Sequence, residues 1–514
     1  MGDLVLDLAR AVPTDALVVA PVLLPLLVAA AQVALGRART AQRVLSTAAL
    51  AVVLVDVCLL LALVDADGVQ VVQLGGWVAP LGISLVVDRL AALLLVTAIA
   101  VLLAVLVFAV GQGIADDAPL PVTAFHPAYL VLAAGISHSF VTGDLFNLFV
   151  AFEVMLVASY VLLTISGTAP QVRSGMTYVV TSLLSSMLFL TGVALIYAAT
   201  GTVGFADLSV KLDDVPDGTR TGLGLVLLVA FGIKAAVFPL FAWLPDSYPT
   251  APAPVTAVFA GLLTKVGVYA ILRTQALLFP SDEPSTVLLV LGTLTMVVGI
   301  LGAIAQQDLK RMLSFTLVSH IGYMIFGLGL WTQAGVAGAV VYVVHHIVVQ
   351  TTLFLVAALV ERRVGTCGLD RMTGVARAAP LLGVLFFLPA LSLAGIPPFS
   401  GFVAKLGLIQ AGVEVGGFWP LVAVAASLAV SLLTLYAVGG AFVRSFMGDV
   451  QLGEDEVDEP TPRGMLVPTL VAVAAVVALA PAAGALYGVG DRAATDLLDR
   501  TTYVTAVEDA GPLR

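Results

Sequence analysis

Charged residues are scarce in this sequence, and their scarcity excludes a soluble globular protein. Only 11% of the 514 residues are charged, whereas a soluble domain has about a quarter. Hydrophobic residues make up 60% of the chain, and the mean hydropathy is +1.09. Apolar runs of about 20 residues, long enough to cross a bilayer, recur along the chain. The sequence therefore predicts an all-α polytopic membrane protein.

Cysteine and cofactor motifs are also scarce. The two cysteines, Cys58 and Cys367, have neither metal-binding nor redox spacing. There is no phosphate-binding glycine loop, iron–sulfur ligand set or flavin motif, so we expect no cofactor, no enzyme activity and no nucleic-acid binding. The first 16 residues carry three aspartates against one arginine, the opposite of a basic signal-peptide n-region. The first apolar run is therefore expected to be a retained span.

Fourteen apolar runs are long enough to be read as membrane spans. They cover residues 17–35, 44–64, 86–110, 126–142, 144–165, 176–200, 221–244, 252–275, 284–305, 313–331, 336–360, 379–409, 417–440 and 465–487. The run at 126–142 is the shortest of them.

The positive charges between these runs predict an orientation. With the N-terminus outside, the inside segments carry twelve Lys and Arg residues and the outside segments carry eight. Three of the eight, Arg492, Arg500 and Arg514, lie in the C-terminal tail. Because positive charges favour cytoplasmic loops, both termini are expected outside the cell membrane. The acidic run Glu454–Glu459 is expected to be a solvated connection.

Lysine is rare, and three of the five lysines lie inside apolar runs. The chain has 18 arginines, almost all in loops, tails and span ends, whereas Lys234, Lys265 and Lys405 lie within spans. Arginine keeps its proton in essentially any protein environment, but a buried lysine can release one. A carboxylate, Glu153, also lies in the middle of a span. These intramembrane groups are candidates for proton transfer, although lysines can also snorkel to an interface or form fixed ion pairs.

Three histidines extend this set of titratable groups. His320, His345 and His346 lie within the expected spans, and histidine titrates near neutral pH. A membrane histidine is often only a hydrogen-bonding group between helices. Metal binding is disfavoured, because adjacent residues on a helix point about 100° apart and no acidic or Cys cluster accompanies them. Asp56 is also in the middle of a span, and no role is assigned to it.

Prolines predict breaks in two spans. Lys234 is five residues before Pro239 in the seventh span, and Lys405 is seven residues after the pair Pro397 and Pro398 in the twelfth. A proline removes a helix hydrogen bond, which a membrane tolerates mainly where the backbone lines a wet or protein-filled cavity. Interrupted helices at matching positions in two halves of a chain are typical of transport sites.

The spacing of these features predicts an internal duplication. Glu153 precedes Lys234 by 81 residues, and His320 precedes Lys405 by 85. Spans four to eight and nine to thirteen then form two repeats, and an odd number of spans gives them opposite topology. The expected regions are residues 1–125 with spans one to three, 126–275 and 284–440 with the inverted repeats, and 441–514 with the acidic loop, the last span and a polar tail.

Three segments carry a resemblance to a known family. They are "GDLFNLFVAFEVMLVASYVLL", "LPDSYPTAPAPVTAVFAGLLTKVGVY" and "LSLAGIPPFSGFVAKLGLI". The chain resembles the D subunits of multisubunit Mrp-type cation/proton antiporters, within the wider family of antiporter-like subunits of respiratory complex I and membrane-bound hydrogenases. The resemblance implies a plasma-membrane subunit that works with other subunits, moves protons coupled to Na⁺ export, and serves pH and sodium homeostasis.

The resemblance also implies roles for the intramembrane residues. Glu153 and Lys234 would form a carboxylate–lysine pair, followed by a central line of Lys265, then His320 or the pair His345 and His346, then Lys405. Gln350 departs from the pattern, since relatives often have Lys there, and Gln cannot titrate.

Two other functions remain open at this point. The chain could be a proton-pumping subunit of a quinone-reducing or hydrogenase complex, with the redox chemistry in partner subunits. It could also be a structural assembly subunit whose intramembrane charges are inert. The segment "PDSYPTAP" and Lys405 favour the antiporter, because the nearest complex I relative tends to have Glu at the latter position.

Overall fold

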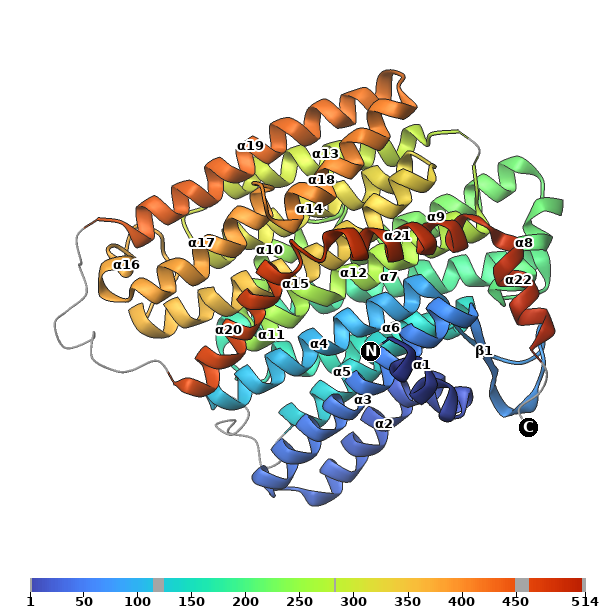
Figure 1. Ribbon diagram of the computed structural model, residues 1–514, viewed down its shortest axis with the longest axis horizontal. Coiled ribbons are helices and arrows are strands. Elements are labelled where there is room, and N and C mark those ends of the chain that lie inside the picture. The colour runs from blue at the N-terminus through green and yellow to red at the C-terminus, as the bar shows by residue number, and fades with distance from the viewer. Residues whose placement is uncertain (1, 114–123, 282, 449–461, 511–514) are drawn as a thin grey trace.

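The protein is a bundle of helices in the computed structural model, which describes residues 2–113, 124–281, 283–448 and 462–510 (Figure 1). The longer helices are α2 (Thr14–Leu35), α3 (Arg39–Asp67), α4 (Arg89–Gln112), α5 (Phe125–Val141), α6 (Leu145–Leu163), α7 (Ala169–Thr200), α9 (Asp217–Ala235), α13 (Thr286–Ile304), α14 (Leu309–Gly329), α15 (Gln333–Val364) and α19 (Phe418–Phe446). The shorter ones are α1 (Gly2–Ala11), α8 (Phe205–Lys211), α10 (Trp243–Ser247), α11 (Ala253–Val258), α12 (Thr264–Leu278), α16 (Val375–Ala378), α17 (Pro380–Ala394), α18 (Ser400–Val415), α20 (Arg463–Ala478), α21 (Ala483–Leu498) and α22 (Arg500–Asp509). Three 3₁₀ turns, the π-helix η4 (Phe259–Leu263) and an antiparallel hairpin of β1 (Gln70–Gln73) and β2 (Ser84–Val87) complete the described elements.

This architecture confirms an all-α, multi-pass membrane protein. Within the described ranges, eleven helices are long and apolar enough to cross a membrane, or twelve if the bent pair α20–α21 counts as one span. Two further expected spans correspond to the 17-residue α5 and to the broken pair α17–α18. The total of fourteen therefore stays a prediction. The acidic run Glu454–Glu459 lies outside the described residues.

The last expected span, 465–487, is wrong as a single helix. The chain forms α20 and α21, which meet at an angle of 77° across a break at residues 479–482. Pro481 lies in the break, and a proline both lacks an N–H and disfavours helical backbone in the residue before it. The apolar run gave no sign of the bend, because hydropathy describes the side chains and not the backbone conformation.

The two predicted helix breaks are confirmed. Helix α9 ends at Ala235 and α17 ends at Ala394, and the residue after each, Ala236 and Gly395, has a left-handed backbone with φ of 58° and 87°. Both ends make the hydrogen bond that closes a helix C-terminus: Val237 N donates to Gly232 O at 2.9 Å, and Ile396 N donates to Leu391 O at 3.1 Å. The proline segments follow these caps, so each break begins at a well-formed helix end.

A second backbone motif also occurs twice. Asp144 caps α6 and pairs with Gly204 in an isolated β-bridge, and Asp308 caps α14 and pairs with Gly368 in the same way. In each bridge the first amide of the capped helix donates to a neighbouring carbonyl at 2.8 Å. The first bridge leads into α8 and the second lies near α16, and these two helices are at opposite ends of the bundle (Figure 1).

The centre of the bundle consists of helices that are almost wholly buried. They are α11, η4 and α12 in succession, together with α14 and α15. Helices α2 and α3 lie along one edge of the bundle and α19 along the opposite edge (Figure 1). Lys265, His320, His345 and His346 are on the central helices and are wholly buried. The fold therefore places four of the predicted site residues in its interior.

One buried ion pair joins the N-terminal helices to the central ones. Asp88, the N-cap of α4, receives two hydrogen bonds from the guanidinium of Arg273 on α12, at 2.5 and 2.8 Å. Both side chains are at most 3% exposed. Burial alone would raise the pKa of Asp88, but the charge and hydrogen bonds of Arg273 hold that pKa below its ordinary value. The pair therefore stays ionised at neutral pH and ties α4 to α12.

Removing the cation of this pair is expected to destabilise the protein. Arg273→Leu leaves the Asp88 carboxylate buried without a counter-charge, which costs about 3–5 kcal/mol. Because the folded-state pKa of Asp88 is lowered, the stabilisation from the wild-type pair should be complete at neutral pH and should be lost only as the pH falls through that lowered value. The measurement is the thermal unfolding temperature of the purified protein. The exposed pair Arg220–Asp213 is a matched control, so Arg220→Leu should change that temperature little.

Candidate functional site

Glu153 and Lys234 are brought together, but a serine hydroxyl lies between them. Glu153 on α6 accepts a hydrogen bond from Ser186 Oγ on α7. Lys234 Nζ on α9 donates to the same Ser186 Oγ at 3.3 Å and to Ser182 O at 3.1 Å. Lys234 is 8% exposed, and Glu153 is half-buried. Ammonium, hydroxyl and carboxylate thus form one hydrogen-bonded series across three helices.

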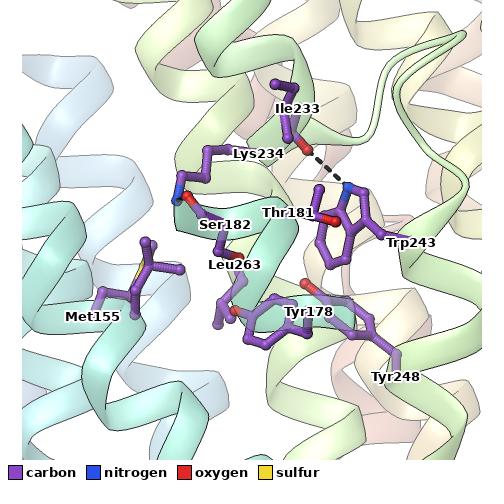
Figure 2. A pocket seen from close by; sticks show the side chains of 10 residues that line it. Met155, Tyr178, Thr181, Ser182, Ile233, Lys234, Trp243, Tyr248 and Leu263 are labelled. Atoms are coloured by element: carbon purple, nitrogen blue, oxygen red, sulfur yellow. Dashed lines mark hydrogen bonds between the residues drawn. The ribbon is translucent and has the colours of Figure 1, made fainter. Parts of the chain in front are cut away.

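A small cavity lies beside Lys234 (Figure 2). The space in which the centre of a water molecule fits is about 10 Å³. A cavity of this size holds about one water molecule. Its lining residues are Met155, Leu156, Tyr178, Thr181, Ser182, Ile233, Lys234, Trp243, Tyr248 and Leu263. The buried hydroxyl of Tyr248 has no hydrogen-bond partner among the described residues. The site beside the lysine is therefore both polar and large enough to hold water.

The chain after the first break forms one wall of this cavity. Trp243 on α10 donates its ring N–H to Ile233 O at 3.0 Å, which ties the segment after the break to the end of α9. Trp243, Tyr178 and Tyr248 pack against one another, with ring centroids 5.4–6.4 Å apart. Tyr248 belongs to the segment "PDSYPTAP" singled out in the sequence, and Trp243 lies just before that segment, so this part of the chain contacts the Lys234 site directly.

Lys265 is wholly buried on the central helices, and among the described residues none of its hydrogen bonds goes to an acidic side chain. Its Nζ donates to Ala260 O at 2.7 Å and lies 3.3 Å from Thr264 Oγ1. Ala260 belongs to the π-helix η4, in which the widened turn displaces carbonyls from the regular α-helical ladder. The lysine therefore satisfies a carbonyl of an irregular turn, which is a polar but uncharged environment.

Close backbone contacts join Lys265 to the helices on either side. Gly267 lies against α9, where an added Cβ would come 2.7 Å from Ala235 N, one residue after Lys234. Gly261 lies against α15, where an added Cβ would come 2.1 Å from Thr351 Oγ1. Glycine at these two positions lets the Lys265 helix contact both the Lys234 helix and the histidine helix.

The histidines lie in a cluster with two tyrosines. His320 Nδ1 on α14 is 2.9 Å from Tyr342 Oη on α15, and the His320 and His346 rings are 5.3 Å apart. Tyr342 stacks on Tyr323 with centroids 5.1 Å apart. His320 Nε2 is 3.4 Å from Thr434 Oγ1 of α19. Every ring in this cluster is buried, so the histidines form a polar patch at the centre of the protein.

Lys405 joins this cluster at the second break. Its Nζ lies 4.9 Å from the centre of the Tyr323 ring, a cation–π distance. The same atom donates to Leu393 O at 3.1 Å and Ala394 O at 3.0 Å, the last carbonyls of α17. A helix C-terminus carries partial negative charge, so the broken helix stabilises the ammonium through its last carbonyls.

Several polar atoms along this central line have no hydrogen-bond partner among the described residues. They are His345 Nε2, both ring nitrogens of His346, Gln350 Oε1, Thr351 Oγ1 and Ser392 Oγ. His345 Nδ1 is 2.9 Å from Ser400 Oγ, and Gln350 Nε2 donates to Leu313 O at 2.7 Å. Buried polar groups are usually satisfied, often by ordered water. Side chains with unpartnered polar atoms thus lie on successive turns of α15, an arrangement typical of a path that contains water.

The sequence did not identify the hydroxyl groups that connect the charged ones. Ser182 and Ser186 are one turn apart on α7, Tyr323 follows His320 by three residues, and His346 follows Tyr342 by four. These are the spacings of helix neighbours, a signal that could have found them. Asp56 on α3 is outside the site. Among the described residues, no three His, Cys, Asp or Glu side chains are grouped closely enough to hold a metal ion.

The chain is similar to membrane antiporter proteins over nearly its whole length. Residues 142–434 match the family model described as NADH:quinone oxidoreductase/Mrp antiporter, TM. The chain is 41% identical over 494 residues to the D subunit of the Na⁺/H⁺ antiporter of Alkalihalophilus pseudofirmus, with 96% of this chain and 99% of that protein covered. It is 37% identical over 505 residues to the corresponding D subunit of Bacillus subtilis, with 95% and 99% covered.

Two solved complexes contain similar chains. A chain of the Mrp complex from a Dietzia species has a TM-score of 0.89 and 33% identity, with 96% of this chain and 99% of that chain covered. A chain of the membrane-bound sulfane sulfur reductase, an archaeal respiratory membrane complex, has a TM-score of 0.85 and 26% identity over the same shares.

Fold, site and these similarities define an antiporter-like membrane subunit. The chain belongs to the family of membrane subunits shared by NADH:quinone oxidoreductases and Mrp antiporters. Within that family, the predicted resemblance to D subunits of Na⁺/H⁺ antiporters is confirmed. These relatives are named as transporter subunits, which agrees with the expectation that the chain is not an enzyme.

Proposed function

We propose that this chain carries protons across the plasma membrane as one subunit of a hetero-oligomeric Na⁺/H⁺ antiporter. The observation that carries the proposal is the succession of buried ionisable groups from α6 to α18, joined by hydroxyls, rings and close helix contacts. Lys234, Lys265 and Lys405 are at most 8% exposed, and none of them forms a direct ion pair with a carboxylate among the described residues. A buried lysine without a fixed counter-charge can release its proton.

The first transfer takes place along the hydrogen bonds between Lys234 and Glu153. Lys234 Nζ gives a proton to Ser186 Oγ as Ser186 gives its own proton to Glu153. The ammonium becomes a neutral amine and the carboxylate a neutral acid, so both charges are neutralised without a net change in charge. The neutral pair changes the electrostatic field at Lys265, whose helix contacts α9 at Gly267.

The second half of the path runs through the histidine cluster to Lys405. Gln350 cannot titrate, so the transfer passes through His320, His345 or His346, with water satisfying their unpartnered nitrogens. Lys405 at the second break is the last proton carrier in this chain. The breaks at Pro239 and Pro397–Pro398 provide the irregular backbone at which water can enter from either side.

The regions 126–275 and 284–440 act as two inverted repeats, preceded by residues 1–125 and followed by 441–514. The paired caps at Asp144 and Asp308 and the paired helix ends at Ala236 and Gly395 support this division. Both termini lie outside the cell, and partner subunits complete the transporter. Na⁺ crosses the complex in exchange for the protons.

A second candidate function is proton pumping in a redox-driven complex. The match to the sulfane sulfur reductase chain, at a TM-score of 0.85, favours it. The higher identity to antiporter D subunits favours antiport. A third possibility, inert structural charges, requires that removing the intramembrane charges leave transport intact.

Ser186→Ala tests the proposed link between Glu153 and Lys234. Loss of the bridging hydroxyl should lower antiport about tenfold, which corresponds to about 1.4 kcal/mol for a hydrogen bond to a charged group. Dye-monitored Na⁺/H⁺ antiport in vesicles measures the rate, with assembly of the complex checked in parallel.

The adjacent residue gives a matched control. Ser185 Oγ donates to Ala230 O at 2.7 Å, so it joins the same two helices without touching the charged pair. Ser185→Ala should keep the wild-type rate, and Ser186→Thr should restore most of it. Equal rates for Ser186→Ala and Ser185→Ala would contradict the proposed transfer.

A further inference from the structure

Asp56 is an intramembrane carboxylate that the proposed proton path does not use. It lies near the middle of the 29-residue helix α3, within the apolar run "AVVLVDVCLLLAL". Its side chain is half-buried, and its Oδ2 atom is buried without a hydrogen-bond partner among the described residues. A carboxylate at this depth is costly, and such groups almost always pair with another polar group.

Three arginines from other helices bind aspartates at the C-terminal end of α3: Arg10 pairs with Asp67, and Arg89 and Arg492 pair with Asp65. Asp65 is nine residues from Asp56, about 13 Å along the helix axis. These arginines are therefore held at the membrane boundary, and within the described ranges the carboxylate at mid-depth has no ion-pair partner.

Asp56 borders an open apolar surface. Five residues at helical spacing form an exposed stripe on α3, hereafter the α3 stripe: Val44, Ala48, Val52, Val55 and Cys58. Asp56 follows Val52 by four residues and lies at the edge of the stripe. Helix α3 runs along an outer edge of the bundle with α2 (Figure 1). A second protein can therefore reach the stripe and the exposed part of the half-buried Asp56 side chain.

We propose that the α3 stripe binds a transmembrane helix of another subunit, and that this helix presents a hydrogen-bond donor to Asp56 at mid-depth. The carboxylate determines the chemistry of the occupant. A lipid tail offers no donor, whereas a lysine, arginine or side-chain hydroxyl or amide on a neighbouring helix does. Similar chains occur in multisubunit membrane complexes, which supplies the class of partner. This interface is separate from the proton path, so either proposal can fail without the other.

Photo-crosslinking in the complete complex tests the occupant. A benzoylphenylalanine at Val55, in a chain that keeps Asp56, reports whatever covers the stripe. We expect an adduct to a transmembrane helix of one partner subunit, with a polar donor side chain within one turn of the crosslinked residue. Adducts to lipid alone, or to a helix with only apolar side chains at that depth, would overturn the proposal.

Substitution of Asp56 tests the hydrogen bond. Asp56→Leu should reduce the yield of assembled complex about threefold to twentyfold, the range expected for one interhelical hydrogen bond in a membrane. Asp56→Asn keeps an acceptor oxygen and should retain most of the yield, and Val52→Leu on the same stripe should match wild type. Antiport per assembled complex should stay unchanged in Asp56→Asn. Wild-type assembly of Asp56→Leu would refute the proposal, and if that variant does not insert, the crosslink at Val55 decides alone.

Discussion

Lys405→Arg is expected to lower Na⁺/H⁺ antiport by about 100-fold or more, the scale of a lost proton-transfer group. Arginine keeps the positive charge and can still donate to the carbonyls of Leu393 and Ala394. It cannot release its proton at any pH at which the protein is folded. The substitution therefore separates a fixed structural charge, which it preserves, from a proton carrier, which it removes.

The control for this variant is a lysine outside the path. Lys211 pairs with Asp207 one turn earlier on α8, and its side chain is 43% exposed, so Lys211→Arg should leave antiport unchanged. Both variants are compared in vesicles with equal amounts of assembled complex. Normal antiport in assembled Lys405→Arg would show that its ammonium serves only to cap the broken helix.

Glu153→Gln is expected to have an effect of similar size, about 100-fold. The amide keeps the shape of the side chain and can accept the hydrogen bond from Ser186, but it can neither hold a negative charge nor receive the proton. Lys234 then lacks both the nearby negative charge of Glu153 and the carboxylate that finally accepts its proton. Antiport should fall at every pH, because no pH restores a carboxylate.

Glu414 provides a carboxylate for comparison. It lies exposed at the end of α18, away from the hydrogen bonds of the site, so Glu414→Gln should behave as wild type. A smaller loss in Glu153→Gln than in Ser186→Ala would indicate that the serine acts in packing and not in the transfer.

The sequence predicted the architecture well because hydropathy and proline act locally. Spans follow from the length of apolar runs, and the breaks follow from Pro239 and from Pro397 and Pro398. The bend at Pro481 was missed, although the same rule applies there, because the surrounding run is uniformly apolar and no charge marks the change of direction.

The charged residues of the site were also predictable, but their contacts were not. Glu153 and Lys234 stand out because charge is rare in an apolar run. Nothing in the sequence distinguishes Ser186 from the other serines of α7. Its role follows only from the packing of α7 between α6 and α9. A serine in a membrane helix is unremarkable until its neighbours across the interface are known.

The positions of the titratable residues in the two halves also could not be predicted from the sequence. Aligning the caps at Asp144 and Asp308 places Leu317 opposite Glu153, with His320 about one helical turn further on. Lys234 precedes its break, whereas Lys405 follows its own. The halves therefore share backbone motifs but place their titratable groups differently, which spacing alone did not reveal.

The central claim is that protons cross this subunit through its buried lysines and Glu153. The most direct measurement is dye-monitored Na⁺/H⁺ antiport in vesicles that carry Glu153→Gln and Lys405→Arg side by side, with assembly of the complex verified. The account predicts that both complexes assemble and that both lose antiport. If both assemble and transport at the wild-type rate, the protons take another route.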